Sequence, residues 1–120
     1  MQRLIPSSIM ERRRKKMRKC KITVLKTHVF QDLADEFVKD PNYTSCPIFK
    51  EGQTFVTGGI FGNEMPEDFG CAMAWPSLEM PVNVLVGGGK VFGFSERHIT
   101  CCNDGVRPVV FLLEAIEDDE

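Results

Sequence analysis

The chain has 120 residues, of which 42% are hydrophobic and 27% are charged, the composition of an ordinary globular protein. A chain of this length is expected to form one domain around one core. Its longest apolar runs, such as residues 109–113, are far shorter than the ~20 residues that cross a bilayer, so we expect no membrane-spanning segment. The basic cluster follows the few apolar residues at the N-terminus, the reverse of a secretory signal, which predicts a cytoplasmic protein.

The formal net charge of −2 hides a division along the chain, because residues 1–20 carry +7 and the remaining residues −9. A basic run of this kind can neutralise phosphates. No aromatic residues are interleaved with it to stack on bases, which disfavours nucleic-acid binding. We therefore expect a solvated basic extension over residues 1–17, a single folded domain over 18–117 and an acidic tail over 118–120.

The folded part begins with a strand and continues with a helix. Apolar and polar residues alternate through residues 20–24, which predicts a strand with Cys20, Ile22 and Val24 toward the core. The apolar residues between 30 and 38 recur at helical spacing in a single stripe, and Asp40-Pro41 ends the pattern. This predicts a short helix whose stripe consists of Phe30, Leu33, Ala34, Phe37 and Val38.

A second strand and a helical region follow. A turn at Glu51-Gly52 leads into a strand that ends at Gly58-Gly59. The segment 65–68 has a proline and two acids, as at a helix start, and predicts a helix carrying Phe69, Cys71, Ala72 and Trp75. Pro76 and Pro81 predict a break or a second short helix before the glycines at 87–89 end this region.

The C-terminal segment predicts a hairpin. Residues 99–102 and 107–116 read as two strands around the turn residues 103–105. The last strand is apolar on both faces, so it lies either in the middle of a sheet or under a partner chain. The order strand-helix-strand-helix-strand-strand predicts an α+β domain with two helical segments and a small, mainly antiparallel sheet or partly closed barrel.

Four fragments stand out together: residues 19–26, residues 46–55, Cys71-x-x-x-Trp75 and residues 102–109. Together they resemble a family of small, uncharacterised prokaryotic proteins that occur as single domains or tandem copies. The resemblance covers about residues 18–117, and its most specific parts are Cys-Pro-x-Phe-Lys-Glu-Gly-Gln from Cys46 and Cys-x-Asp-Gly-x-Arg-Pro from Cys102. It implies a fold unit without an established activity. The matching motif positions are Cys46, Cys71, Cys102, Asp104 and Arg107, with Cys20 less secure.

Five cysteines in a chain expected to be cytoplasmic indicate packing, metal binding or redox chemistry. No Cys-x-x-Cys is present, but Cys46, Cys71 and Cys102 each lie at a predicted element boundary and could converge. Such a site could hold zinc or iron through thiolates, or undergo reversible oxidation, with Cys71 activated by a helix N-terminus. Cys101 should face away from Cys102 on a strand. Inert core thiols remain the alternative that receives the larger weight.

Other candidate ligand-binding residues have plainer structural roles. Trp75 could be a stacking wall for a ligand or a core anchor. Asp104 and Arg107 could accept turn amides and pair with each other, or Arg107 could bind a small anionic ligand beside Cys102. His98 could join Cys102 in a metal shell, or simply lie at the surface.

Three function classes follow from these residues. The leading hypothesis is a thiol-site binding module, for metal or redox chemistry, built from Cys46, Cys71 and Cys102. The alternative is a structural homo-oligomer with the cysteines packed in its core. An enzyme acting on a small anionic substrate at Arg107 and Cys71 is weaker, since the sequence offers no identifiable base.

Overall fold

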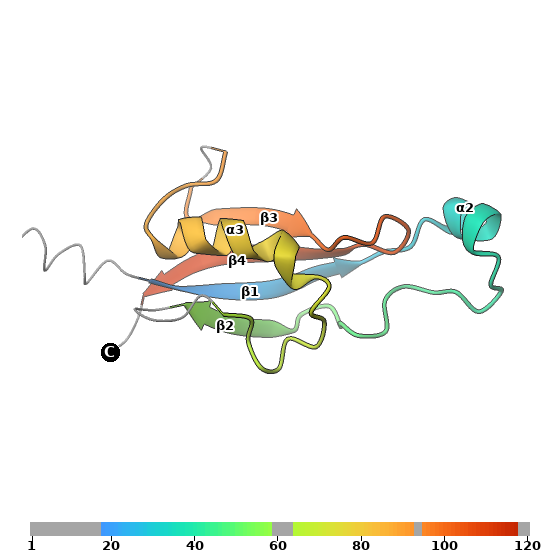
Figure 1. Ribbon diagram of the computed structural model, residues 1–120, viewed down its shortest axis with the longest axis horizontal. Coiled ribbons are helices and arrows are strands. Elements are labelled where there is room, and N and C mark those ends of the chain that lie inside the picture. The colour runs from blue at the N-terminus through green and yellow to red at the C-terminus, as the bar shows by residue number, and fades with distance from the viewer. Residues whose placement is uncertain (1–17, 59–63, 93–94, 118–120) are drawn as a thin grey trace, which may run out of the picture.

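The computed structural model describes residues 18–58, 64–92 and 95–117, so the predicted basic extension and acidic tail lie outside the described residues. Four strands form one antiparallel sheet in the order β2-β1-β4-β3, and helix α3 lies across one of its faces (Figure 1). The predicted α+β class with an antiparallel sheet is confirmed. The sheet stays open and does not close into a barrel. In the described part of the chain, no helix is long and apolar enough to cross a membrane.

The two central strands are β1 (Arg18–Thr27) and β4 (Val109–Glu117), paired along most of their length with an irregularity between Val24 and Lys26. Cys20, Ile22 and Val24 are buried as their alternation predicts. Strand β4 lies between β1 and β3, in the interior of the sheet, which is one of the two positions predicted for a strand that is apolar on both faces. Only the side of Val109, Phe111 and Leu113 is buried, whereas Val110 and Leu112 on the other side are half-buried.

The two outer strands are β2 (Thr54–Gly58) and β3 (Arg97–Cys101). Gly52 adopts a φ of +90° in the turn before β2, which agrees with the turn predicted there. Strands β3 and β4 pair antiparallel, which confirms the predicted hairpin, although residues 102–108 make its connection wider than a tight turn.

Helix α3 (Trp75–Val86) corrects the prediction for the middle of the chain. Residues 64–74 contain turns, and the helix begins at Trp75 and not near Met65. It also runs through Pro81 without the expected break. Pro76 occupies the first turn, where a missing N–H costs nothing, and burial of the Pro81 ring offsets the loss of one hydrogen bond. The buried stripe of α3 comprises Trp75, Leu78, Pro81, Val82, Leu85 and Val86.

The helix predicted over residues 30–38 exists, but it does not pack on the core. The short α2 (Gln31–Leu33) continues into a wider π-type turn, η1 (Ala34–Val38), closed by the Lys39 N–H donating to the Ala34 carbonyl at 2.9 Å. This segment stands beyond the end of β1, away from the sheet (Figure 1). Of its apolar stripe only Ala34 is buried, while four members are exposed: Phe30, Leu33, Phe37 and Val38.

Aromatic rings fill the core at the N-terminal end of α3, around Trp75. The ring of Phe69 lies 5.1 Å from those of both Phe49 and Phe55, measured between centroids, and 5.6–5.7 Å from Phe111 and Trp75. Phe69 precedes α3, Phe49 and Phe55 flank the turn before β2, and Phe111 belongs to β4. This cluster therefore ties the irregular segment 64–74 to the sheet.

Replacing Phe69 with Ala removes the centre of this cluster and should lower the free energy of unfolding by about 3–5 kcal/mol. The exposed Phe92, whose side chain is 83% exposed, is the matched control, and Phe92→Ala should cost under about 1 kcal/mol. Urea denaturation of both variants measures the difference. Equal losses in the two variants would show that Phe69 does not organise the core.

Candidate functional site

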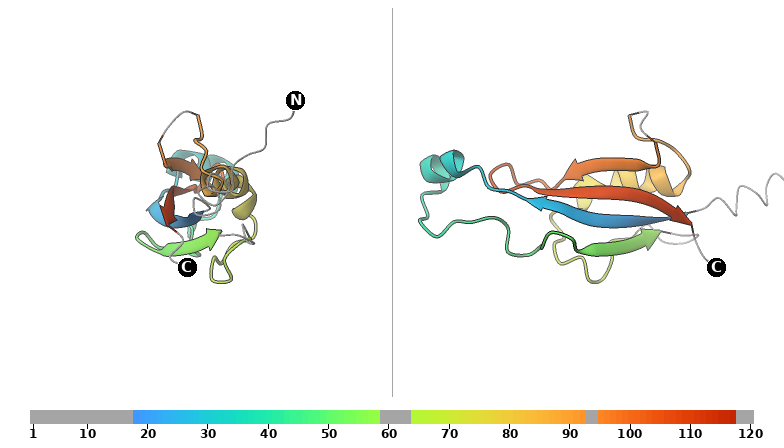
Figure 2. Two further views of the ribbon diagram at one scale, coloured as in Figure 1. Left: turned by 90° about the vertical axis from the view of Figure 1, so that its left-hand side faces the viewer. Right: turned by 180° about the vertical axis from the view of Figure 1, so that it is seen from behind.

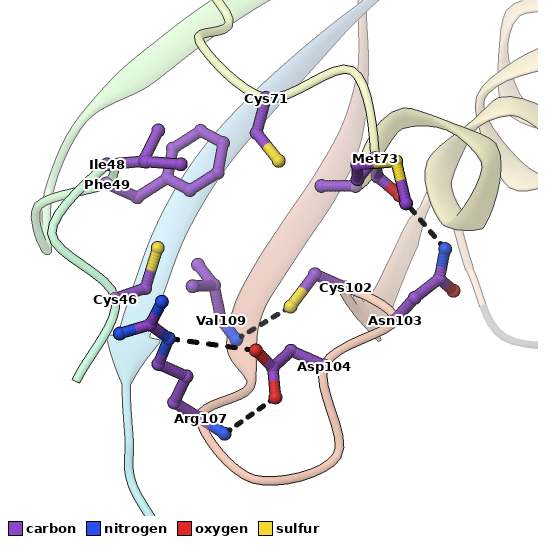
Figure 3. A pocket seen from close by; sticks show the side chains of 11 residues that line it. Cys46, Ile48, Phe49, Cys71, Met73, Cys102, Asn103, Asp104, Arg107 and Val109 are labelled. Carbon is purple, nitrogen blue, oxygen red and sulfur yellow. Dashed lines mark hydrogen bonds and ion pairs between the residues drawn. The ribbon is translucent and has the colours of Figure 1, made fainter. Parts of the chain in front are cut away.

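A pocket of about 350 Å³ lies at the end of the core where three connecting segments meet (Figure 3). Cys46 comes from the loop before β2, Cys71 from the turn before α3 and Cys102 from the β3–β4 connection. The structure thus brings to one pocket three cysteines that are 25 residues or more apart in the chain. All three side chains are half-buried.

Local backbone structure holds Cys102 and Cys71 in place. The Cys102 N–H donates to the Val109 carbonyl at 3.0 Å, and the Val109 N–H in turn donates to the Cys102 sulfur at 3.3 Å. The carbonyl of Cys71 accepts a hydrogen bond from the Ala74 N–H at 3.3 Å. Gly70, at φ +87°, sets the bend before Cys71, and a side chain there would press on Ile48.

The rest of the lining is mostly apolar. Apart from Asp104 and Arg107, these residues were not predicted as site residues, although Ile48 and Asn103 lie within the two most specific motif fragments. Apolar walls with a few polar groups are the usual composition of a small-molecule site. The remaining lining residues are Ile48, Phe49, Met73, Ala74, Asn103, Asp104, Arg107 and Val109.

The thiols do not form a ready metal centre. Within the part of the chain that the structure describes, no group of three or more His, Cys, Asp or Glu side chains is placed to hold a metal ion. The hypothesis of zinc or iron bound by Cys46, Cys71 and Cys102 therefore has no geometric support, although the three residues share the pocket. The expected activation of Cys71 by a helix N-terminus also loses its basis, since α3 begins four residues later.

Asp104 and Arg107 perform the structural roles weighed for them. One carboxylate oxygen of Asp104 accepts the backbone N–H groups of Val106 and Arg107 at 2.9 and 3.1 Å. The hydrogen bond from the Arg107 N–H is the main cause of a lowered Asp104 pKa. The Arg107 side chain pairs with Asp104 at 3.7 Å and stacks over the Tyr43 ring at 4.5 Å. The guanidinium at the pocket is thus already engaged on two sides.

Asn103 joins the pocket to the start of α3. Its side-chain amide donates to the Met73 carbonyl at 2.9 Å, and its oxygen accepts a hydrogen bond from the Ser77 hydroxyl. These two bonds fix the β3–β4 connection against the turn that carries Cys71. The width of the pocket therefore depends on Asn103 as well as on the aromatic core.

Three other candidates lie away from the pocket. Trp75 is buried in the core beside Phe69 and does not line the pocket, which agrees with the core-anchor role. His98 shares its strand face with Thr100, and its ring lies beside Phe92, 5.9 Å between centroids. His28 lies against Phe30. None of the three is positioned to complete a thiol site.

The remaining two cysteines have contrasting environments. Cys20 is fully buried in β1, and this burial raises the pKa of its thiol from 9.0 to about 12. Cys101, the last residue of β3, is exposed, whereas the next residue, Cys102, is half-buried. This agrees with the prediction that the two neighbouring side chains point to opposite faces.

Comparison with known proteins adds no relative. No family model, no curated protein and no solved structure matches this chain. The family resemblance drawn from the four fragments therefore stays a prediction.

The environments of the five cysteines predict an order of alkylation. With iodoacetamide under native conditions, the exposed Cys101 should react first and the half-buried Cys46, Cys71 and Cys102 more slowly. Cys20 should stay unmodified until the protein is denatured, because its thiol is buried and its pKa is raised. Peptide mass spectrometry over a time course measures each rate. Modification of Cys20 at the rate of Cys101 would contradict the packing described for β1.

Cys20 also predicts how stability changes in alkaline solution. Between about pH 9 and 12 the unfolded chain releases the thiol proton that the folded chain keeps, so stability is full below pH 9 and falls as the pH rises. Through Cys20, the free energy of unfolding falls by at most about 1.4 kcal/mol per pH unit. Urea denaturation between pH 8 and 10.5 should show a shallower decline in Cys20→Ala than in the parent protein. Identical declines would show that Cys20 does not contribute.

Proposed function

We propose that this protein is a binding module that captures small disulfides at the pocket formed around Cys46, Cys71 and Cys102. The observation that supports the proposal is the convergence of three of the five cysteines, from three distant segments, on one apolar pocket of about 350 Å³. The packing of cysteines as small apolar residues would not require three of them to meet at one pocket, because Cys20 shows that a single strand position can bury a thiol fully.

The lining favours a ligand recognised through sulfur and apolar contact. The polar groups at the pocket are engaged within the protein, Asn103 with Met73 and Ser77, and Arg107 with Asp104. The ion pair with Asp104 already offsets the charge of Arg107, which makes this residue a weaker site for the small anion of the alternative hypothesis. The thiols keep their reactive sulfur atoms at the pocket.

The chemistry proposed is exchange with a low-molecular-weight disulfide. The thiolate of one pocket cysteine attacks one sulfur of the small disulfide, forming a protein–ligand S–S bond as the original S–S bond breaks. The other half of the small molecule leaves as a thiolate and takes up the proton that the cysteine lost. A second small thiol reverses the step. The protein thus gains and loses a covalently held ligand according to the ratio of small disulfide to thiol.

Cystamine, the disulfide of 2-aminoethanethiol, is a suitable probe because each half is small enough for the pocket. We expect cystamine to modify one of Cys46, Cys71 and Cys102 at least about fivefold faster than Cys101, which is the reverse of the iodoacetamide order. Site-resolved mass spectrometry of the full chain measures both orders. If Cys101 is modified first by both reagents, exposure alone governs reactivity and the proposal fails.

A pair of matched variants tests whether the pocket itself causes the preference. Ile48, at 49% exposure, lines the pocket, whereas Val56, at 50%, lies on the opposite face of the sheet. Ile48→Trp should obstruct the pocket and slow cystamine modification there about fivefold or more, with no change at Cys101. Val56→Trp should leave both rates unchanged. Equal effects of the two substitutions would contradict a role for the pocket.

A further inference from the structure

The sheet has one face that no described helix or strand covers. Helix α3 packs on the side of Cys20, Ile22 and Val24, and the view from behind shows the strands in front of the helix with their other side open (Figure 2). We call this other side the open face. It presents the exposed Leu25, Val56 and Ile99, and the half-buried Val110, Leu112 and Ile116.

The open face also has a hollow and a predominantly basic character. A cavity of about 470 Å³ is lined there by Leu25, Ile99 and Leu112 together with Ser95, Arg97 and His98. The strand register places Lys21, Lys26 and Arg97 on the same face, with Glu114 as an acidic partner that pairs with Arg97 at 3.3 Å. The face thus combines an apolar depression with surrounding positive charge.

The segment from Phe30 to Asp40, which we call the tip, has the complementary character. Its exposed apolar side chains include Phe37, at 70% exposure, and Phe30, at 43%. Its polar side is acidic, with Asp32, Asp35, Glu36 and Asp40 against the single base Lys39.

The tip does not reach the open face of its own chain. The N–H groups of His28 and Phe30 donate to the carbonyls of Pro108 and Val106, at 3.1 and 2.8 Å. Arg107 stacks on Tyr43 where the chain returns. These contacts hold the tip beyond the end of β1, as Figure 1 and the right-hand view of Figure 2 show.

We infer that the tip of one copy docks on the open face of a second copy, with Phe37 entering the hollow beside Ile99 and Leu112. Two unpartnered apolar surfaces of the same chain become buried in this contact, and an acidic segment meets a basic face. A large aromatic side chain in a pocket is the usual energetic centre of an interface. The contact joins two different surfaces, so each copy offers both a donor and an acceptor.

Analytical ultracentrifugation of the full chain over a range of concentrations tests the inference. We expect a species of at least twice 13.6 kDa whose dissociation constant rises about tenfold or more in both Phe37→Asp and Ile99→Asp. Met80→Asp is the control, because Met80 is 58% exposed on α3, away from both surfaces, and should change the constant less than twofold. Because neither surface belongs to the thiol-lined pocket, cystamine modification of Cys46, Cys71 and Cys102 should be the same in all three variants.

Mixing the two interface variants gives the decisive result. The Phe37→Asp chain keeps an intact open face and the Ile99→Asp chain an intact tip, so the mixture should associate at concentrations where each variant alone is monomeric. If Ile99→Asp loses association and Phe37→Asp keeps it, the contact joins two open faces. If Phe37→Asp loses association and Ile99→Asp keeps it, the contact joins two tips. Either result, or a parent protein that is monomeric at all concentrations, would overturn the inference.

Discussion

The packing of Phe69 between the sheet and the start of α3 is the contact on which the remaining structure depends. Residues 64–74 have no helix or strand of their own, and Phe69 anchors them through its contacts with Phe49, Phe55, Phe111 and Trp75. Because Cys71 follows Phe69 by two residues, the same anchor sets one wall of the pocket. The close packing of these rings thus positions the Cys71 thiol at the pocket, although the disulfide exchange proposed for the pocket does not involve the rings.

A single helix covers only one side of a four-stranded sheet, and this asymmetry organises the surface of the protein. On the covered side, the strands contribute Ile22, Val24, Phe111 and Leu113 to the buried core. On the open face, apolar residues alternate with charges, as they do where a sheet is covered only in part. The thiol-lined pocket lies at one end of the covered side, so the proposed ligand site and the proposed contact between copies occupy separate surfaces.

Sequence patterns predicted the strands better than the helices, for a physical reason. Alternation with period two requires only that one face of a strand be buried, and Cys20, Ile22 and Val24 satisfy this locally. The start of α3 could not be placed in this way, because the helical signals at Met65–Asp68 compete with the demand that Phe69 enter the core. Pro81 likewise predicts a break in the helix from the sequence alone. In the folded protein the helix continues, because the Pro81 ring is buried against the core.

The sequence by itself determined the class of fold, the central place of β4 as one of two alternatives, and which cysteines lie near the ends of regular elements. Only the tertiary structure decided that Cys46, Cys71 and Cys102 share a pocket, that Trp75 faces the core and that the helical stripe at residues 30–38 faces outward. Local periodicity shows that one face of a segment is apolar. The surface that packs against this face is formed by residues far along the chain. That choice depends on chain connectivity and packing, which no local pattern contains.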